Sequence, residues 1–370
     1  MTRHRQVAAA GVLAAVIAIG LLAGRVAGRQ APSASSPNAT AARGTSQAPR
    51  TPWGAPDLQG IWSSNTITPL ERPEKYAGRE FLTDEDVAAE IAAREQAAER
   101  RRRAPRGTVT DLDAPPEEAA RVVGAYQAIW SPAGRNYVRT KRTSLIVDPP
   151  DGKIPPLTPE GQKRAEAGRW RTAYEHVKFM DLLRADGPED RNDPERCRAL
   201  QLPCINFLCH LTRIVQTSGS ISIYSEGHDG GSYRTILLDK RPHLPQQIRQ
   251  WLGDSLGHWE GDTLVVETTN FSNQTNFFGA TENLRLVERY TRVEPDMILY
   301  RVTIDDPTTF TSAWTIEMPF IKADERRNQI FEAACHEGNE GLSGILAGAR
   351  AIEKEKAEAD RKGSKRKVSR

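Results

Sequence analysis

The residues from 213 to 336 alternate apolar and polar side chains with a period of two. Successive side chains of a β-strand point to opposite faces, so this period predicts strands with one buried and one exposed face. Turn-forming residues, such as those of 294–296, separate the runs and favour hairpins. The expected strands cover residues 214–216, 221–224, 235–238, 257–269 (two strands around Gly261), 284–293, 297–304, 310–320 and 329–336.

Consecutive hairpins predict an antiparallel meander. Because exposed strand edges promote aggregation, we expect the meander to close into a calycin-like barrel or a strongly curved sheet. Residues 57–62 are expected to form a first strand that pairs with the later meander, and residues 143–148 a strand that Pro149 ends. The predicted fold class is therefore mainly β (α+β), with peripheral helices.

Helices are expected both before and after the meander along the sequence. Helical patterns cover residues 83–103, with Thr83 as the N-cap, and residues 115–130 and 158–174. Their apolar stripes are thin, so they should pack on something larger rather than form a bundle. A last helix is predicted over 342–359. The domain organisation is therefore a single β-rich domain over 51–360, with a helical insertion at about residues 80–200.

The N-terminus has the pattern of an export signal. Arg3 and Arg5 precede an apolar run over residues 7–24, as in a signal peptide. The run is about as long as a bilayer span, so residues 1–30 are either a cleaved signal peptide or an N-terminal anchor in the inner membrane. Residues 31–50 are rich in Ala, Ser, Thr and Pro and are expected to be a disordered linker. The expected location is periplasmic or secreted.

Charge is distributed unevenly along the chain. The net charge is +3, but residues 1–50 hold six arginines and residues 361–370 hold six basic residues, with no acidic residue in either segment. The remaining residues, 51–360, are therefore acidic overall, and an acidic body repels phosphate, which argues against nucleic acid as a partner. The tail 361–370 has one apolar residue and is expected to be disordered.

Four cysteines, Cys197, Cys204, Cys209 and Cys335, suit an exported protein. They allow three pairings, and their spacing alone leaves all three open. None of them forms a C-x-x-C pair, which argues against a zinc ribbon or a thioredoxin-like motif.

Several long motifs resemble a family of exported bacterial proteins for which no activity is established. The motifs are Arg241-Pro-His-Leu-Pro, Arg249-Gln-Trp-Leu-Gly-Asp-Ser, the run 258–271 that begins His258-Trp-Glu-Gly-Asp, Ala334-Cys-His-Glu-Gly-Asn, and the Trp- and Gly-containing segment 52–62. The resemblance covers about residues 51–350. It implies a disulfide between Cys197 and Cys335, because these two occupy family-like positions. The chain departs from the family pattern at residues 230–232 and at Cys204 and Cys209.

A shorter resemblance concerns the predicted first strand. Gly60-Ile-Trp62 is similar to the Gly-x-Trp signature of lipocalins, but lipocalins lack a helical insertion of this size.

Polar residues within the strand region are the candidates for a functional site. Phosphate-binding glycine loops, the G-x-S-x-G elbow and the H-E-x-x-H pair are absent from the sequence. Imidazoles near neutral pH suit proton transfer, so the predicted catalytic residues are His228, His336 and Glu337. The predicted ligand-binding residues are Glu226, Arg234, His258 and Glu260, with Arg234 expected to bind an anionic group.

Positions within the strands refine these candidates. His228 and His336 each follow a predicted strand, so both are expected at one open end of the barrel. His258 and Glu260 are two residues apart and should share a face of one strand. His243 lies between two prolines and is expected to fix a loop. Metal ligands and a cofactor cannot be assigned from this spacing.

Two classes of function follow. The first is an exported barrel that binds a small, partly apolar molecule, with an enzymatic version in which the histidines transfer protons. The second is a non-catalytic envelope protein that acts as a scaffold or interaction partner. If the N-terminal segment is not cleaved, residues 7–24 also contact the inner membrane.

Overall fold

The computed structural model describes residues 49–103, 139–166, 185–191, 195–198, 202–203, 205, 211–226, 231–275, 277–327, 330–331 and 335–368. The chain divides into two compact units, residues 1–45 and 46–370, and the second contains all of the described residues. The expected signal segment 1–30, the linker up to residue 48 and the expected helix 115–130 lie outside the described residues.

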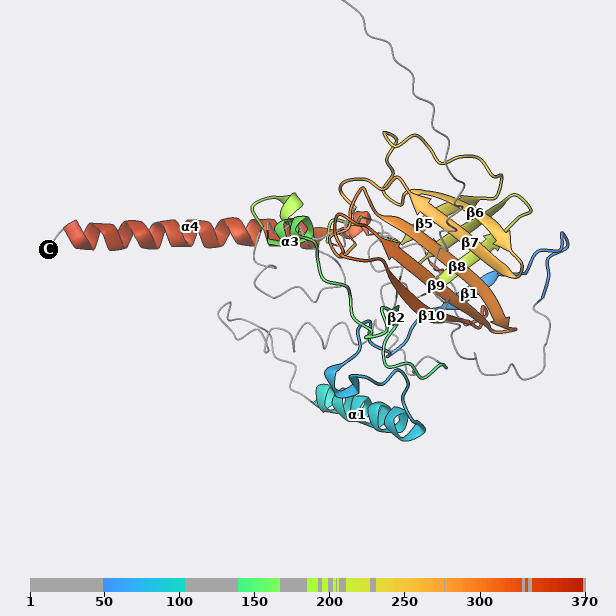
Figure 1. The fold of residues 1–370 in the computed structure, drawn as a ribbon. Coiled ribbons are helices and arrows are strands. Elements are labelled where there is room, and N and C mark those ends of the chain that lie inside the picture. The colour runs from blue at the N-terminus through green and yellow to red at the C-terminus, as the bar shows by residue number, and fades with distance from the viewer. Residues whose placement is uncertain are drawn as a thin grey trace, which may run out of the picture. The chain divides into compact units, whose positions relative to one another are not determined.

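A closed, nine-stranded β-barrel is the centre of the fold (Figure 1). Neighbouring strands follow the order β1-β3-β4-β5-β6-β7-β8-β9-β10, and β1 also pairs with β10, which closes the barrel. A tenth strand, β2, is added to β10. The strands are β1 Gly60–Ser63, β2 Ile146–Asp148, β3 Thr212–Gln216, β4 Ser220–Ser225, β5 Ser232–Leu237, β6 Asp254–Glu260, β7 Thr263–Thr269, β8 Arg285–Glu294, β9 Met297–Asp305 and β10 Trp314–Lys322.

The first strand closes the barrel as the sequence predicts. Trp62 lies opposite Thr212 of β3 and opposite Lys322 of β10. Its ring is fully buried, its Nε1 donates to the Leu58 carbonyl at 2.9 Å, and the Arg292 guanidinium lies 5.4 Å from the ring centre. A cation over a tryptophan face is attracted to the ring. The Gly-x-Trp segment therefore joins the two ends of the sheet.

One strand pair corrects the expected all-antiparallel meander. β5 and β6 are parallel, with Leu237 opposite Leu256, whereas the other barrel pairs are antiparallel. Parallel neighbours cannot be joined by a tight hairpin, so the chain must turn back before β6 can run in the same direction as β5. The loop over residues 238–253, called the crossing loop here, makes this reversal. The expectation failed because the motifs of this loop do not reveal the direction of the next strand.

Two polar side chains hold the crossing loop in place. The buried Asp254 carboxylate accepts hydrogen bonds from Arg241 Nη2 at 2.9 Å and from the Leu244 amide at 3.0 Å, and it lies 2.9 Å from His243 Nδ1. The side-chain nitrogen of Asn270, Nδ2, donates to the Leu244 carbonyl and to two further carbonyls of the loop. His243 thus fixes a loop, as predicted, and the motif residues around it build the crossing.

Asp254→Ala is expected to lower the free energy of unfolding by about 2–3 kcal/mol, because it leaves buried donors without their charged acceptor. Urea unfolding measures this change. Asp262→Ala is the matched control: Asp262 is 60% exposed and pairs with Arg50, so its loss should stay within about 0.5 kcal/mol. Equal losses in the two variants would contradict this role of Asp254.

Two helices begin where the sequence predicts. α1, Asp84–Arg103, is capped by Thr83, whose hydroxyl accepts from the Asp86 amide at 3.1 Å while the Asp86 carboxylate accepts from the Thr83 amide at 3.0 Å. α3, Pro159–Glu166, begins after Thr158, whose hydroxyl accepts from the Gly161 amide at 3.0 Å. Short 3₁₀ helices cover η1 Glu74–Tyr76, η3 Pro188–Asp190 and η5 His336–Gly338.

The C-terminal part differs from the prediction. The helix α4 runs over Glu340–Val368, beyond its expected end at 359, and includes most of the tail that was expected to be disordered. Lysine and arginine have good helix propensity and interact favourably with the negative end of the helix dipole. No helix among the described residues is long and apolar enough to span a bilayer.

The expected strand over 329–336 is also wrong for the residues described there. Cys335 lies outside any strand, and His336–Gly338 forms η5. Since β1 pairs with β10, it occupies the edge that a following strand would have used. Cys335 instead forms a disulfide with Cys197, with a Cα–Cα distance of 5.5 Å, which is the pairing that the family resemblance implied.

Candidate functional site

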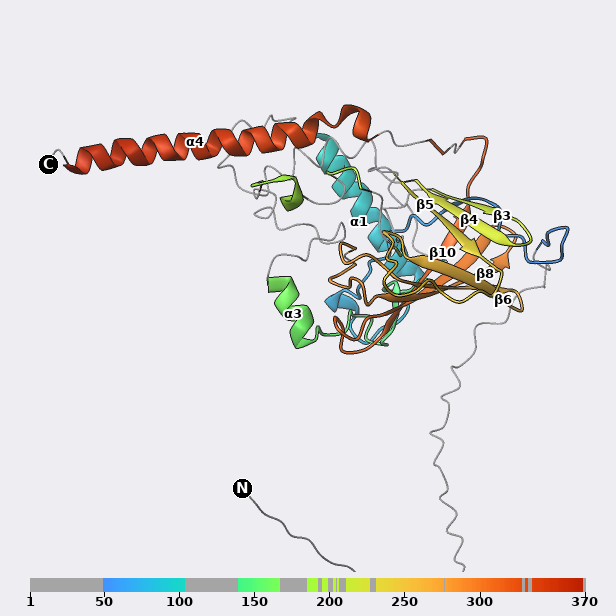
Figure 2. The same cartoon turned by 90° about the horizontal axis from the view of Figure 1, so that it is seen from above.

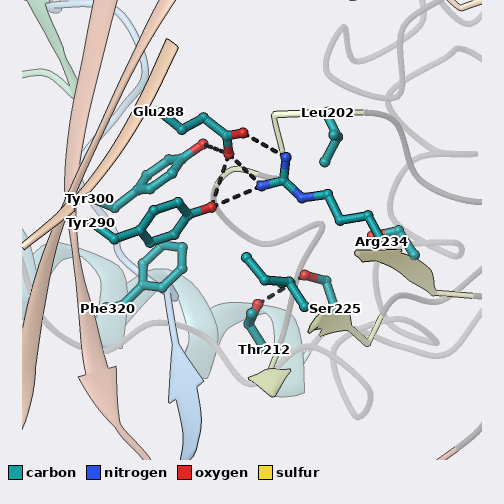
Figure 3. Close-up of a pocket in the computed structure, with 10 residues that line it drawn as sticks. Leu202, Thr212, Ser225, Arg234, Glu288, Tyr290, Tyr300 and Phe320 are labelled. Atoms are coloured by element: carbon teal, nitrogen blue, oxygen red, sulfur yellow. Dashed lines mark hydrogen bonds and ion pairs between the residues drawn. The ribbon is translucent and has the colours of Figure 1, made fainter. Parts of the chain in front are cut away.

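A small cavity lies inside the barrel (Figure 3). Nine of its lining residues come from barrel strands, and Leu202 comes from the chain between α3 and β3. The volume open to the centre of a water molecule is about 10 Å³, which is the space of a single water. The lining residues are Leu202, Thr212, Ile223, Ser225, Ser232, Arg234, Glu288, Tyr290, Tyr300 and Phe320.

A buried ion pair forms one side of the cavity. Arg234 Nη1 lies 2.6 Å from Glu288 Oε2, and Nη2 lies 2.7 Å from Oε1. The side chains are 7% and 1% exposed, respectively. The hydroxyls of Tyr290 and Tyr300 each donate to Glu288 Oε1 at 2.9 Å. The carboxylate is thus surrounded by donors, as a buried charge requires.

Strand alternation places these charges inside the barrel. On β5 the buried residues are Ser232, Arg234 and Ile236, and on β8 Glu288 and Tyr290 belong to the same alternating buried face. Figure 2 shows β3, β4 and β5 side by side, and Arg234 lies opposite Ile223 of β4. A basic side chain from one part of the wall therefore meets an acidic side chain from another across the interior.

One polar atom at the cavity has no partner among the described residues. Arg234 Nε is buried and makes no hydrogen bond there. In Figure 3 the hydroxyls of Thr212 and Ser225, which are 3.1 Å apart, lie on the other side of the cavity from Glu288. The apolar part of the lining is Leu202, Ile223 and Phe320. The cavity therefore offers an N–H donor and hydroxyls beside an apolar wall.

Burial and the charge of Glu288 shift the pKa values of Tyr290, Tyr300 and Arg234. Burial first, and then the negative charge of Glu288, raise the pKa of Tyr290 and of Tyr300 well above the ordinary tyrosine value. For Arg234, burial lowers the pKa, but the charge of Glu288 outweighs burial and the pKa is raised. At the cavity the two phenols thus stay neutral beside the guanidinium of Arg234.

The raised tyrosine pKa values predict an alkaline loss of stability. Above about pH 10 the unfolded chain loses the protons of Tyr290 and Tyr300, whereas the folded chain retains them. The free energy of unfolding should therefore be unaffected below this pH and should fall by about 2.7 kcal/mol per pH unit above it, until the folded pKa values are reached. Urea unfolding between pH 9 and about 11 measures the slope.

The control is the variant Tyr290→Phe with Tyr300→Phe, which should lose this part of the slope. Tyr76 adds to the slope in both proteins, because burial and its hydrogen bond with Glu90 raise its pKa to about 12. An unchanged slope in the double variant would show that the two buried tyrosines are not its source.

Among the predicted site residues that the structure describes, Arg234 lines the cavity and the others lie elsewhere. Glu226 follows β4 and accepts a hydrogen bond from the Phe331 amide at 3.3 Å. His336 and Glu337 are exposed on η5. His228 lies outside the described residues, so its sharing of a cavity with His336 stays a prediction.

His258 and Glu260 share a strand face, as predicted, and that face is the outer one. Both are exposed on β6, with His258 Nε2 3.2 Å from Glu260 Oε1 and Arg289 Nη1 2.8 Å from Glu260 Oε2. This cluster is an exposed surface network and does not contact the cavity.

Most residues of the cavity were not predicted from the sequence. Glu288, Tyr290 and Tyr300 were not among its candidates. A signal existed: within 286–292, Glu288 has the same alternating position as the apolar Leu286 and the aromatic Tyr290, so it belongs to the inward face. A lone charge at such a position predicts a buried partner of opposite charge.

A metal site is not found in the described part of the chain. No group of three or more His, Cys, Asp or Glu side chains converges there in a way that could hold an ion. Comparison with models of protein families and with characterised proteins finds no match to this chain. Membership of the exported family that the motifs resemble therefore stays a prediction.

Proposed function

We propose that the barrel binds a small neutral molecule, with one oxygen acceptor and a short apolar part, in the cavity beside Arg234. The supporting observation is Arg234 Nε, a buried N–H without a partner among the described residues. An unsatisfied buried donor costs about 1–3 kcal/mol. A ligand oxygen that accepts this hydrogen bond recovers that cost.

The charges of the cavity favour a neutral ligand. Glu288 already balances the guanidinium of Arg234 with two hydrogen bonds. An anion beside Arg234 would place a second negative charge next to Glu288 in a medium of low dielectric constant, where like charges repel strongly. Because the bidentate partner of Arg234 is a residue of the same chain, we propose a neutral ligand in place of the anionic group that the sequence led us to expect.

The remaining walls define the other parts of the ligand. Ser225 and Ser232 present hydroxyls, which both donate and accept hydrogen bonds. Leu202, Ile223 and Phe320 suit a short hydrocarbon group. With Leu202 in place the cavity has the space of one water, so an organic molecule enters as Leu202 moves aside.

We place this binding outside the cytoplasm. The export pattern of residues 1–30 supports this location, and so does the Cys197–Cys335 disulfide, because disulfides persist in oxidising compartments. No imidazole lines the cavity among the described residues, so the proposal is one of binding rather than of histidine catalysis.

The test is saturation-transfer NMR with butyramide and butyrate, which differ in charge and match in apolar chain. We expect a transfer signal for butyramide and a much weaker one for butyrate. Ser232→Val fills the cavity and should abolish the butyramide signal. Ser222→Val, on the outer side of neighbouring β4, is the matched control and should retain it. A stronger signal from butyrate, or none from butyramide, would refute the proposal.

The second candidate is a non-catalytic structural barrel. The observation that favours it is the small cavity volume, since a single bound water would satisfy Arg234 Nε. In that case neither compound binds, and Ser232→Val changes only the free energy of unfolding.

A further inference from the structure

The outer surface of the barrel differs between two groups of strands. On β6 to β10, outward side chains form ion pairs, which are Glu260 with Arg289, Glu267 with Arg285 and Glu317 with Arg301. On β3, β4 and β5, which lie side by side (Figure 2), no outward position carries an acidic residue. The tyrosine face, as we call this second surface, comprises Arg213, Val215, Ser222, Tyr224, Tyr233 and Thr235.

Strand register arranges the tyrosine face in two rows. Arg213 of β3 lies opposite Tyr224 of β4, and Tyr224 lies opposite Tyr233 of β5. The next row consists of Val215, Ser222 and Thr235. Neighbouring strands are about 4.8 Å apart, so each row crosses about 10 Å of the surface. The face is therefore a platform in which a cation, aromatic rings and hydroxyls are close neighbours.

Tyr233 is the most exposed part of this platform. Its side chain is 62% exposed, and Val215 in the next row is 49% exposed. The Thr235 hydroxyl donates to Tyr233 Oη at 3.3 Å, and Ser222 Oγ lies 3.3 Å from the same atom. These hydrogen bonds, that of Ser222 first, lower the pKa of Tyr233 below the ordinary tyrosine value. Contacts from two strands thus hold an exposed ring in place, and a ring already held loses little freedom when a ligand covers it.

Arg213 is a cation without a counter-charge. Its side chain is exposed, and no carboxylate in the described part of the chain forms an ion pair with it. A guanidinium binds a carboxylate with two parallel hydrogen bonds. Charge complementarity therefore favours an anionic ligand on the tyrosine face.

The size and chemistry of the face favour a polyhydroxylated ligand. Stable protein complexes involve about 20–30 residues on each side, far more than this platform offers. Sugar C–H groups are weakly positive and are attracted to the negative face of an aromatic ring. The hydroxyls of Ser222 and Thr235 both donate and accept hydrogen bonds, as sugar hydroxyls do.

We propose that the tyrosine face binds an acidic polysaccharide, with a sugar ring stacked on Tyr233 and a sugar carboxylate bound by Arg213. This site is separate from the cavity, because successive side chains of a strand point to opposite faces of the sheet. Arg234, the neighbour of Tyr233 on β5, accordingly faces inward.

Isothermal titration calorimetry of the full chain with hexagalacturonate tests the proposal. We expect binding, and an affinity at least about tenfold lower for the neutral xylohexaose, which lacks the carboxylates. Arg213→Gln should weaken hexagalacturonate binding at least about tenfold, and Tyr233→Ala about tenfold. Both side chains are exposed, so both variants should keep the wild-type fold, which circular dichroism checks. Absence of hexagalacturonate binding, or equal affinity for xylohexaose, would overturn the proposal.

Two control variants separate this site from general charge attraction and from the cavity. Arg289→Gln removes the same charge from an outward arginine of β8 that is paired with Glu260, and it should keep the wild-type affinity. An equal loss in Arg289→Gln and Arg213→Gln would show unspecific attraction and refute the site. Ser232→Val, which fills the cavity, should also leave hexagalacturonate binding unchanged, so the two binding proposals stand or fall separately.

Hexaglutamate distinguishes a sugar from an acidic peptide. It carries carboxylates without sugar rings, so its affinity should be at least about tenfold lower than that of hexagalacturonate. Equal or tighter binding of hexaglutamate would assign the face to acidic peptides and overturn the assignment to a polysaccharide.

Discussion

Arg234→Met is expected to lower the free energy of unfolding by about 3–5 kcal/mol, because it leaves the charge of Glu288 buried without its partner. The hydroxyls of Tyr290 and Tyr300 still donate to Glu288 Oε1, but neutral donors do not balance a full charge in the interior. Urea unfolding at neutral pH measures the loss.

Two further variants separate the buried charge from the loss of a large side chain. Arg234→Met combined with Glu288→Met removes both charges and should recover most of the stability, since apolar replacements of buried pairs are often neutral. Arg289→Met is the control. Arg289 lies on the outer side of β8 and pairs with Glu260, and both side chains are about half exposed. Its effect should stay below about 1 kcal/mol. If the double variant is less stable than Arg234→Met, the ion pair is not the source of the loss.

Cys197→Ser with Cys335→Ser is expected to lower the free energy of unfolding by about 4–5 kcal/mol in the chain-entropy model. The disulfide closes a loop of 138 positions, and cutting it releases this loop in the unfolded chain. The measurement is urea unfolding of the oxidised protein and of the double serine variant.

Asn339→Ala is the control for the loss of stability expected in the double serine variant. It removes the hydrogen bonds to Cys197 Sγ and to the Glu195 carbonyl, and the one that the Leu342 amide donates to Asn339 Oδ1 at the start of α4, but it keeps the covalent bond. Its cost should be about 1–2 kcal/mol for these half-buried bonds. A double serine variant that is as stable as Asn339→Ala would contradict the loop-closure account.

The strands and their turns were predictable because they depend on neighbours in the sequence. Alternation with a period of two placed β3, β4, β7, β8 and β9 close to their observed bounds, and Thr83 and Thr158 marked the starts of two helices. The pairing of the 57–62 segment with the later meander was also expected, since a barrel must join its ends. These features follow from local sterics and hydrophobic pattern.

The partners of the interior charges were not predictable in the same way. Arg234 was a candidate, yet its partner Glu288 is 54 positions away and was overlooked. The parallel pairing of β5 with β6 was missed because the loop motifs, now seen to bind Asp254 and Asn270, look alike whichever way the next strand runs.

By itself, the sequence of this protein determined the fold class, most strand positions and two helix starts, because each depends on residues a few positions apart. The tertiary structure alone decided the direction of β6, the pairing of Arg234 with Glu288 and the place of Leu202 at the cavity. Each of these joins residues from distant parts of the chain, and which side chains meet across a closed barrel depends on strand order and register together.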